Sequence, residues 1–209
     1  LSPFSACTQL TEINVDEANP YFSSLDGVLT DKNRTTIVAY PAGKGKRYII
    51  PDGITKIGTH SFFACYPITY IHIPNSVKTI ELFAFASCTD LDTVILGNSV
   101  DSIEVAAFRI NDRLKTIYSM NPIPPAAHTG AFDSFNSFFI QCTLHVPAGS
   151  LQAYKNAEVW KNFKNIVEND FTGIERPSPD KAKIFGNKNS IAFRNIEPGT
   201  DISIYDTTG

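Results

Sequence analysis

The sequence predicts a mostly β solenoid, in which short strands from successive coils stack on one another. Three features support this prediction: apolar residues that recur every 23 residues, short stretches that alternate apolar and polar residues, and turn sequences between them. A fixed period of about 20–29 residues built on Leu and Ile is typical of a leucine-rich solenoid. One coil cannot bury its own apolar side, whereas stacked coils can, because each lends a face to the next.

The repeat is clearest between residues 50 and 123, where seven sets of residues keep the 23-residue interval. The sets are Phe62, Phe85 and Phe108; Cys65, Cys88 and Asn111; Ile68, Leu91 and Leu114; Ile71, Val94 and Ile117; Ile50, Ile73 and Leu96; Ile54, Val77, Val100 and Ile123; and Ile57, Ile80 and Ile103. We therefore expect about six coils of about 23 residues, wound as a right-handed solenoid around one core.

Each coil is expected to begin with a short strand. In "TYIHIP" at residues 69–74 the alternation predicts a strand with Ile71 and Ile73 facing the core and with Tyr70 and His72 facing outward. The Pro-Asn pair that follows ends the strand. The next stretch, up to Phe85, is too short and irregular for a long helix, so we expect extended pieces and a helical turn or two.

The first two units depart from the regular repeat. "PFSACTQLTEINV" at residues 3–15 matches the repeat pattern and predicts a coil. Because a solenoid needs a capped end and this sequence starts inside a repeat, we expect further repeats and a targeting signal upstream. In residues 19–53, "GVLT" and "TTIVAY" are typical of strands, with "DKNR" as the turn between them. This pattern predicts a β-hairpin inserted at about residues 20–48, after which Tyr48 and Ile50 restore the core register.

The end of the repeat region is expected to be closed by a cap. Relative to the 23-residue period, Ala131 and Phe132 are shifted by one residue toward the C-terminus, and Leu144 and Val146 are shifted by four. Three residues are therefore inserted between these two pairs. "SLQAYKNAEVWKNFKNI" then predicts a helical cap at residues 150–168, in which Leu151, Tyr154 and Trp160 cover the open end of the core.

The domain organisation expected from this pattern has three parts. A solenoid occupies residues 1–168, and a polar linker that contains "ERPSPDKAK" occupies residues 169–182. The start of a truncated β-rich module follows at residues 183–209, with strands in "IFGNKNSIAFRNI" and "TDISIYDTTG". Three short strands bury too little surface to fold alone.

Composition excludes some classes of function. The chain has 209 residues, of which 43% are hydrophobic, and its formal net charge is −3, so we expect no nucleic acid partner. It contains no run of about 18 apolar residues, so we expect no transmembrane helix.

The cysteines and histidines predict no metal site, and we expect no cofactor. No C-x-x-C pair occurs, and Cys7, Cys65 and Cys88 share one repeat position, which favours buried thiols. A Cys65–Cys88 disulfide remains an alternative if the coils bring the two Cα atoms within about 4.4–6.8 Å. His72 and His145 occupy equivalent outward positions three coils apart, about 14 Å from each other, so one metal ion cannot bridge them.

The sequence also lacks the signature of an active site, so we predict that the chain is not an enzyme. No G-x-S-x-G, H-E-x-x-H or Cys-His motif occurs. The loop with Gly43 and Gly45 precedes a strand, whereas a phosphate-binding loop opens a helix. Asp26, Asp31 and Asn33 lack the spacing of a calcium loop and are interpreted as turn residues.

The outward strand positions form a candidate binding surface. One row comprises Asn14, Ile49, His72, Ile95, Tyr118 and His145, and a parallel row comprises Glu12, Arg47, Tyr70, Thr93, Thr116 and Thr143. The candidate contact residues are Tyr70, His72, Ile95, Tyr118, His145, Arg47 and Ile49. Exposed aromatic side chains beside polar groups are favoured at protein interfaces. Two alternatives are that Ile95 and Tyr118 only raise strand propensity, and that the Tyr and His rings contact sugars.

Three sequence elements resemble one known family. They are Ala84-Phe85 with Cys88; Ile71-His72-Ile73-Pro74-Asn75-Ser76-Val77; and Val146-Pro147-Ala148-Gly149-Ser150. Together with the inserted unit they are similar to the BspA-type leucine-rich repeats, and the resemblance covers roughly residues 1–168. The tail is similar to the beginning of C-terminal β-sandwich sorting or anchoring modules.

The resemblance implies a secreted or surface-displayed bacterial protein without catalytic residues, from a family in which several members are described as adhesins for host proteins. The resulting hypothesis is a non-catalytic module for protein recognition or adhesion through the β face, located outside the cell or on its surface. The alternatives are a glycan-binding accessory protein and a structural spacer within a larger surface protein or enzyme.

Overall fold

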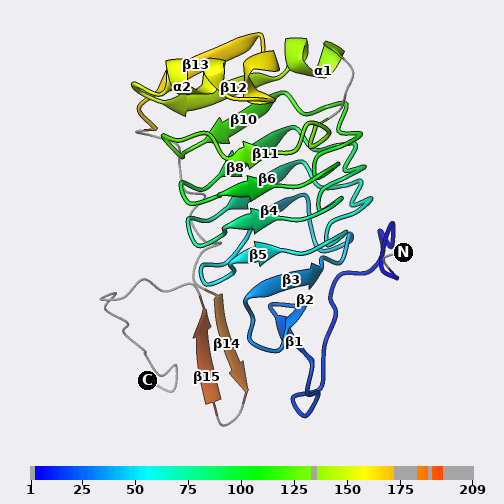
Figure 1. Ribbon diagram of the computed structural model, residues 1–209. Coiled ribbons are helices and arrows are strands. Elements are labelled where there is room, and N and C mark those ends of the chain that lie inside the picture. Colours follow the sequence, from blue (N-terminus) through cyan, green and yellow to red (C-terminus); the bar gives the residue numbers. More distant parts are fainter. Residues whose placement is uncertain (1–2, 133–135, 172–182, 188–189, 195–209) are drawn as a thin grey trace, which may run out of the picture. The chain divides into compact units, whose positions relative to one another are not determined.

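A computed structural model describes residues 3–132, 136–171, 183–187 and 190–194 of the chain. The chain divides into two compact units, Leu1–Thr172 and Gly173–Gly209. The first unit is a stack of coils, and each regular coil contributes one strand to each of two sheets (Figure 1). The mostly β solenoid predicted from the 23-residue period is confirmed.

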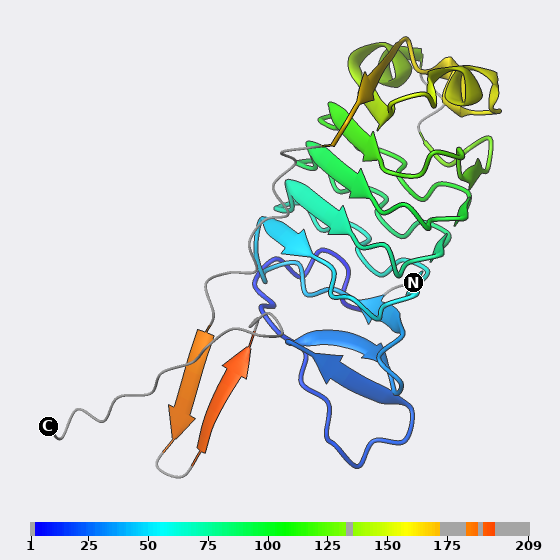
Figure 2. The ribbon, with the colours of Figure 1, turned by 90° about the vertical axis from the view of Figure 1, so that its left-hand side faces the viewer.

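One sheet has six strands, all parallel where they pair, in the order β13-β12-β10-β8-β6-β4. Its strands are β4 (Arg47–Ile49), β6 (Tyr70–Ile73), β8 (Thr93–Leu96), β10 (Thr116–Ser119), β12 (Thr143–Pro147) and β13 (Asn165–Asn169). The strands follow one another coil by coil (Figure 2). The strand predicted in "TYIHIP" is β6.

The other sheet has seven strands, in the order β1-β2-β3-β5-β7-β9-β11. Its strands are β1 (Phe22–Leu25), β2 (Val28–Asp31), β3 (Thr36–Ala39), β5 (Lys56–Ile57), β7 (Thr79–Ile80), β9 (Ser102–Ile103) and β11 (Ala126–Ala127). The extended pieces expected after each strand of the six-stranded sheet are therefore real: β5, β7, β9 and β11 pair in parallel.

A column of stacked aromatic rings runs through the core. The rings of Tyr40, Phe62, Phe85, Phe108 and Phe132 follow one another with centroid distances of 4.8, 4.8, 5.1 and 5.5 Å. The same hydrogen bond recurs beside the column, because the backbone N–H groups of the three regular Phe residues each donate to the next coil at 2.8 Å. Ring stacking and backbone pairing thus require the same register between coils.

The turns next to this column use the left-handed backbone region. Ala64, Ser87 and Ile110 have φ values of 56°, 61° and 59°, and they occupy one position in three successive coils. Consecutive residues bond i to i+3 around them, as in Cys65 N–H to Phe62 O at 3.2 Å. The helical turns expected here are replaced by these β-turns, because the chain must reverse within a few residues.

Beside the aromatic column, Cys65, Cys88 and Asn111 occupy one repeat position and form a second column of small side chains. Cys88 Sγ lies 3.1 Å from Phe62 O, and Cys65 Sγ lies 3.8 Å from Tyr40 O. Asn111 takes this position in the next coil and donates from Nδ2 to Phe85 O and Phe108 O, both at 3.0 Å. Each side chain therefore satisfies a buried carbonyl group of the coil before it.

The inserted unit is larger than the predicted hairpin. Strands β2 and β3 and the turn between them occur where "GVLT", "TTIVAY" and "DKNR" predict them, and β2 and β3 pair antiparallel. The missed element is β1, which pairs with β2 through a two-residue Asp26-Gly27 turn with positive φ at both residues. Tyr48 and Ile50 are buried, as expected.

The cap is confirmed, but it is not one helix. It contains α2 (Leu151–Asn156) and a short 3₁₀ helix (Trp160–Asn162), between which Val159 has a φ of 71°. Another short helix, α1 (Asn136–Gln141), occupies the insertion before β12. Trp160 is fully buried against Phe132, with ring centroids 5.6 Å apart, and its indole N–H donates to Pro125 O at 2.7 Å. The edge of β12 is covered by β13, which pairs with it in parallel.

Two sequence expectations about the coils are wrong. Ile123 was expected in the core with Val100, but it is 72% exposed. Prolines flank Ile123, and Asn121 Oδ1 accepts the Ile123 N–H at 2.9 Å, so the loop turns outward. Tyr154 and Trp160 of the cap donate hydrogen bonds to carbonyl groups of this loop. Residues 11–15 form no strand, because Ser24 Oγ accepts the Val15 N–H and donates to Ile13 O.

The second unit contains a hairpin, described by itself. Strands β14 (Lys183–Asn187) and β15 (Ser190–Arg194) pair antiparallel over five residues. These are the strands expected in "IFGNKNSIAFRNI". The strand expected in "TDISIYDTTG" and most of the expected linker lie outside the described residues, and Asn169, at the start of that linker, belongs to β13.

Replacing Phe85 with Ala should lower the free energy of unfolding by about 3–5 kcal/mol, because the ring is fully buried between two stacked neighbours. Urea unfolding followed by Trp160 fluorescence measures this change. The control is Tyr66→Ala, where the side chain is 41% exposed and the expected change is within about 0.5 kcal/mol. Equal effects at both positions would contradict the role given to the column.

The left-handed turns lead to a second prediction. At these positions a Gly variant should be more stable than an Ala variant, the reverse of the usual order of stability. Ile110→Gly should be more stable than Ile110→Ala by about 0.5–1 kcal/mol, because Gly adopts a positive φ without the steric penalty of a Cβ atom. Comparing these two variants removes the effect of losing the Ile side chain, which is partly exposed. Thermal or urea unfolding that finds the Ala variant more stable would refute the assignment of strain to this turn.

Candidate functional site

The outer face of the six-stranded sheet, the side that points away from the core, carries two rows of side chains in register. The first row is Arg47, Tyr70, Thr93, Thr116, Thr143 and Asn165. The second row is Ile49, His72, Ile95, Tyr118, His145 and Val167. Neighbouring members stand about 4.8 Å apart along each row. The structure therefore brings all seven predicted contact residues onto one face.

At one end of the first row, Arg47 covers Tyr70. The guanidinium carbon of Arg47 lies 4.0 Å from the centroid of the Tyr70 ring, and Arg47 itself is exposed. Tyr70 is only 8% exposed, and burial raises the pKa of its phenol while the Arg47 charge opposes that rise. The expectation that Tyr70 is an exposed aromatic is wrong, because the cation on the neighbouring strand stacks over it.

In the middle of the second row, Ile95 is buried as well. Its side chain is 2% exposed, although it was expected to face solvent. The register places it directly between the rings of His72 and Tyr118 on the two neighbouring strands. Ile95 therefore belongs to a packed layer on the outer face and offers a partner little surface of its own.

The other end of the second row is an aromatic cluster with partial exposure. Tyr118 and His145 stack with ring centroids 4.6 Å apart and an angle of 21° between ring planes. Phe171 meets Tyr118 edge to face at 6.4 Å. Burial lowers the pKa of His145, so its ring is neutral at physiological pH, and its Nδ1 atom is buried without a hydrogen-bond partner.

Sequence reasoning missed two residues at this end of the outer face, Val167 and Phe171. Val167 continues the second row beyond His145 and is 46% exposed. The signal was the alternation in "NIVEN" at residues 165–169, where Ile166 takes the inward position in register with Leu144. This stretch was assigned to the cap and the linker instead. The expected first members of the two rows, Asn14 and Glu12, lie outside the sheet.

Charges beside the outer face are paired between coils. Asp90 binds Arg113 at 2.8 Å, and Asp92 lies 3.7 Å from Lys115. In each pair the two residues occupy equivalent positions of adjacent coils. Exposed pairs of this kind contribute little to stability. They do pair opposite charges on the flank of the strands. The rows themselves are mostly uncharged, because Arg47 is their one residue that is always charged.

The geometry provides no metal centre in the part of the chain that the structure describes. Among these residues, no group of three or more His, Cys, Asp or Glu side chains could hold an ion. His72 and His145 lie on β6 and β12, which two other strands separate. None of the helices in the described ranges has the length and apolar character needed to cross a membrane.

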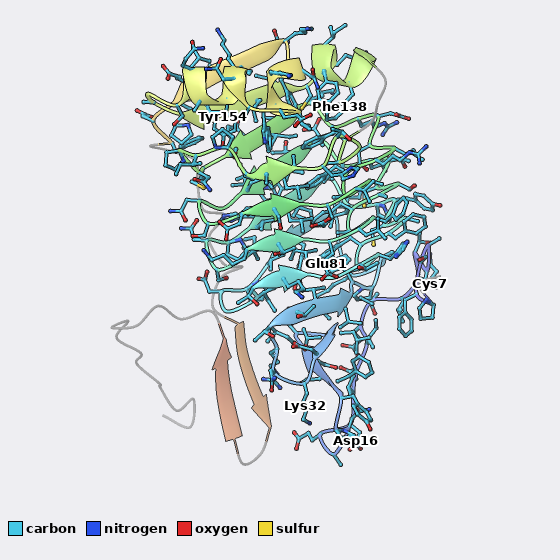
Figure 3. All side chains as sticks on the ribbon, viewed as in Figure 1. Cys7, Asp16, Lys32, Glu81, Phe138 and Tyr154 are labelled. Carbon is cyan, nitrogen blue, oxygen red and sulfur yellow. The ribbon has the colours of Figure 1, made fainter. Side chains whose placement is uncertain are left out.

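The four cysteines are free thiols. The Cys65–Cys88 disulfide, one of two alternatives left open by the sequence, is not formed in this structure. Burial raises the pKa of Cys65 and of Cys142 to about 12, and it also raises the pKa of Cys88 well above its ordinary value. Cys7 is exposed and lies at the edge of the first unit (Figure 3).

Comparison with known proteins places the fold. The model of the BspA-type leucine-rich-repeat region matches residues 40–145 in six copies, just over half of the chain. A leucine-rich-repeat protein from Eubacterium ventriosum shares 25% identity with a TM-score of 0.55, over 69% of this chain and 38% of that one. The pneumococcal vaccine antigen PcpA has a TM-score of 0.50 at 18% identity, over 76% of this chain and 50% of that one.

The chain thus spans half or less of the length of these two solved chains, and the likeness to the pneumococcal antigen shows the fold alone. No curated protein matches the chain.

The burial of the thiols predicts their reactivity. At about pH 8 a thiol reagent should modify one of the four cysteines in the native protein, Cys7, and all four in denaturant, because the thiolate is the reactive species and burial disfavours it. Mass spectrometry counts the labels. A Cys7→Ser variant should take up none in the native state, and rapid native labelling of that variant would contradict the burial of the other three thiols.

Proposed function

The chain belongs to the BspA-type leucine-rich-repeat family, and from this premise we propose that it is a non-catalytic binding module of a bacterial surface or secreted protein. Its partner is a protein, and the contact surface is the outer face of the six-stranded sheet. The family is associated with bacterial surface proteins, and repeats of this kind are typically scaffolds rather than catalysts. Recognition or adhesion is therefore the role that the fold favours.

The observation that carries this proposal is the pair of uninterrupted rows on the outer face. Six parallel strands hold them in one register, so the backbone that carries these side chains is already ordered before binding. The rows combine aromatic, aliphatic and threonine side chains, while the charges next to them are paired. Interfaces favour this composition, with aromatic anchors and few charges at the centre.

The anchor within the rows is the cluster of Tyr118, His145 and Val167. These side chains retain partial exposure, whereas Tyr70 and Ile95 are covered. The Tyr118 and His145 rings stack on each other, so each shows a partner an edge and at most one open face. A sugar would need a broad flat platform, and for this reason a protein surface is the partner we favour over a glycan.

The proposal predicts that the double substitution Tyr118→Ala and His145→Ala weakens partner binding by about 2 kcal/mol or more, as expected for two neighbouring anchor residues. A panel of purified extracellular-matrix proteins, together with a glycan array, serves to detect the partner. Biolayer interferometry then measures the affinity of each variant. Folding should remain unchanged, because neither side chain belongs to the aromatic column in the core.

The matched control is the pair Lys78→Ala and Asp101→Ala, which removes an exposed ion pair with a 3.9 Å separation from the side of the seven-stranded sheet. This variant should bind as well as the native chain. Loss of binding in the control, with binding retained in the Tyr118 and His145 variant, would assign the contact to the wrong face. Binding to the glycan array alone would replace the protein partner with a carbohydrate.

A further inference from the structure

The last strand of the six-stranded sheet has an open edge with unusual properties. Strand β13 pairs with β12 over all five residues, Asn165 to Asn169, without a register shift. Among the described residues no strand pairs with its other side. In Figures 1 and 2 it lies at the end of the coil stack. An unpaired edge presents backbone N–H and C=O groups to any strand that can reach it.

The backbone groups on this edge can be assigned. Asn169 O accepts the Ala148 N–H at 3.2 Å, so Asn169 directs its backbone toward β12. Because backbone direction alternates along a strand, Asn165 and Val167 also face β12, and Ile166 and Glu168 direct their N–H and C=O groups away from the sheet. The open edge therefore offers two donors and two acceptors in regular spacing.

Three of the usual protections of an edge strand, a Lys, a Pro and a β-bulge, are absent from β13 itself, although α1 bonds to its first end through Ile140 O, which accepts the Asn165 Nδ2–H at 3.0 Å. The one charged side chain of β13 is engaged elsewhere, since Glu168 Oε1 accepts the N–H groups of Gly149 at 2.8 Å and Leu151 at 3.1 Å. By contrast, the opposite edge strand, β4, has three residues, begins at Arg47 and follows Lys44 and Lys46.

The chain also leaves the edge clear directly after β13. Asn169 Oδ1 accepts the Phe171 N–H at 2.8 Å, and Phe171 has a φ of 54°, which turns the backbone sharply. The Phe171 ring then lies against Tyr118 on the outer face. Residues 170 and 171 therefore turn toward the outer face rather than along the open side of β13.

We propose that the open edge of β13 is a self-association site, at which β13 of a second copy of this chain pairs antiparallel across a two-fold axis at Val167. With this centre, Ile166 of one copy faces Glu168 of the other, and each such pair exchanges two N–H···O bonds. Val167, 46% exposed in one chain, meets its own counterpart as a close, non-hydrogen-bonded pair on the outer face.

The charges that flank β13 select this arrangement. Lys164 precedes the strand and Asp170 follows it, and both residues are exposed. In an antiparallel pair centred on Val167, Lys164 of each copy faces Asp170 of the other, because the two positions are equally distant from the centre. A parallel pair in register would instead place like charges opposite each other, which is unfavourable. Two six-stranded sheets would then join into one continuous outer face.

Analytical ultracentrifugation of the full chain over a wide concentration range tests the proposal, which predicts a reversible monomer–dimer equilibrium. Val167→Lys should raise the dimer dissociation constant about tenfold or more, because it places two cations at the axis and removes an apolar contact. Lys164→Asp should also weaken the dimer, and the double variant Lys164→Asp with Asp170→Lys should restore it. Circular dichroism and Trp160 fluorescence check that each variant is folded.

Matched controls make the outcomes decisive. Lys115→Asp changes an exposed cation on the same sheet but away from the edge, and it should leave the dimer unchanged. A chain that stays monomeric at every concentration would overturn the proposal, and so would a dimer that survives Val167→Lys. Failure of the charge swap to restore association, with Val167→Lys effective, would overturn the antiparallel register.

Discussion

The structure depends on one constraint: every coil must meet the next in the same register. A single coil contains only short strands and cannot bury its apolar side chains. The aromatic column, the two sheets and the hydrogen bonds of the turns each join coil to coil, and each is satisfied only at one alignment. The small donors Cys65, Cys88 and Asn111 add the same condition, because each bonds a carbonyl group of the preceding coil.

This constraint also produces the candidate site. Once the core residues of successive strands are aligned, the residues that alternate with them must align as well, and the outer face becomes two straight rows. The positions are fixed by the scaffold while the side chains at them are free to vary, which suits a recognition surface. The same register continues at the end of the stack, where β13 pairs with β12, extends both rows and covers the edge of β12.

Much of the fold follows from the sequence because the repeat acts on core residues, where only apolar side chains of similar size fit. The aromatic column, the strand with Ile71 and Ile73, and the hairpin strands β2 and β3 were all predictable in this way. Periodicity failed where local chemistry overrides it. The prolines around Ile123 turn that loop outward, and the positive φ of Val159 divides the predicted cap helix.

The residues that lie on the outer face were predictable from the sequence, but their exposure to solvent was not. Alternation shows which residues point outward, yet it does not show that Arg47 stacks over Tyr70 or that Ile95 is buried between His72 and Tyr118. Such burial depends on side chains from adjacent strands, which lie 23 residues apart in the chain. Val167, in β13, and Phe171, just after it, were missed because this segment follows the cap and does not keep the 23-residue period.

Native-state hydrogen exchange tests the central claim most directly, because amide protection reports the cooperative units of a fold. If the register joins the coils into one unit, the amides of β6, β8, β10 and β12 should exchange together, at a common free energy close to that of global unfolding, and Phe85→Ala should lower protection in all four strands alike. Stepwise exchange, in which each coil opens at its own free energy and the substitution affects only its neighbours, would contradict this account.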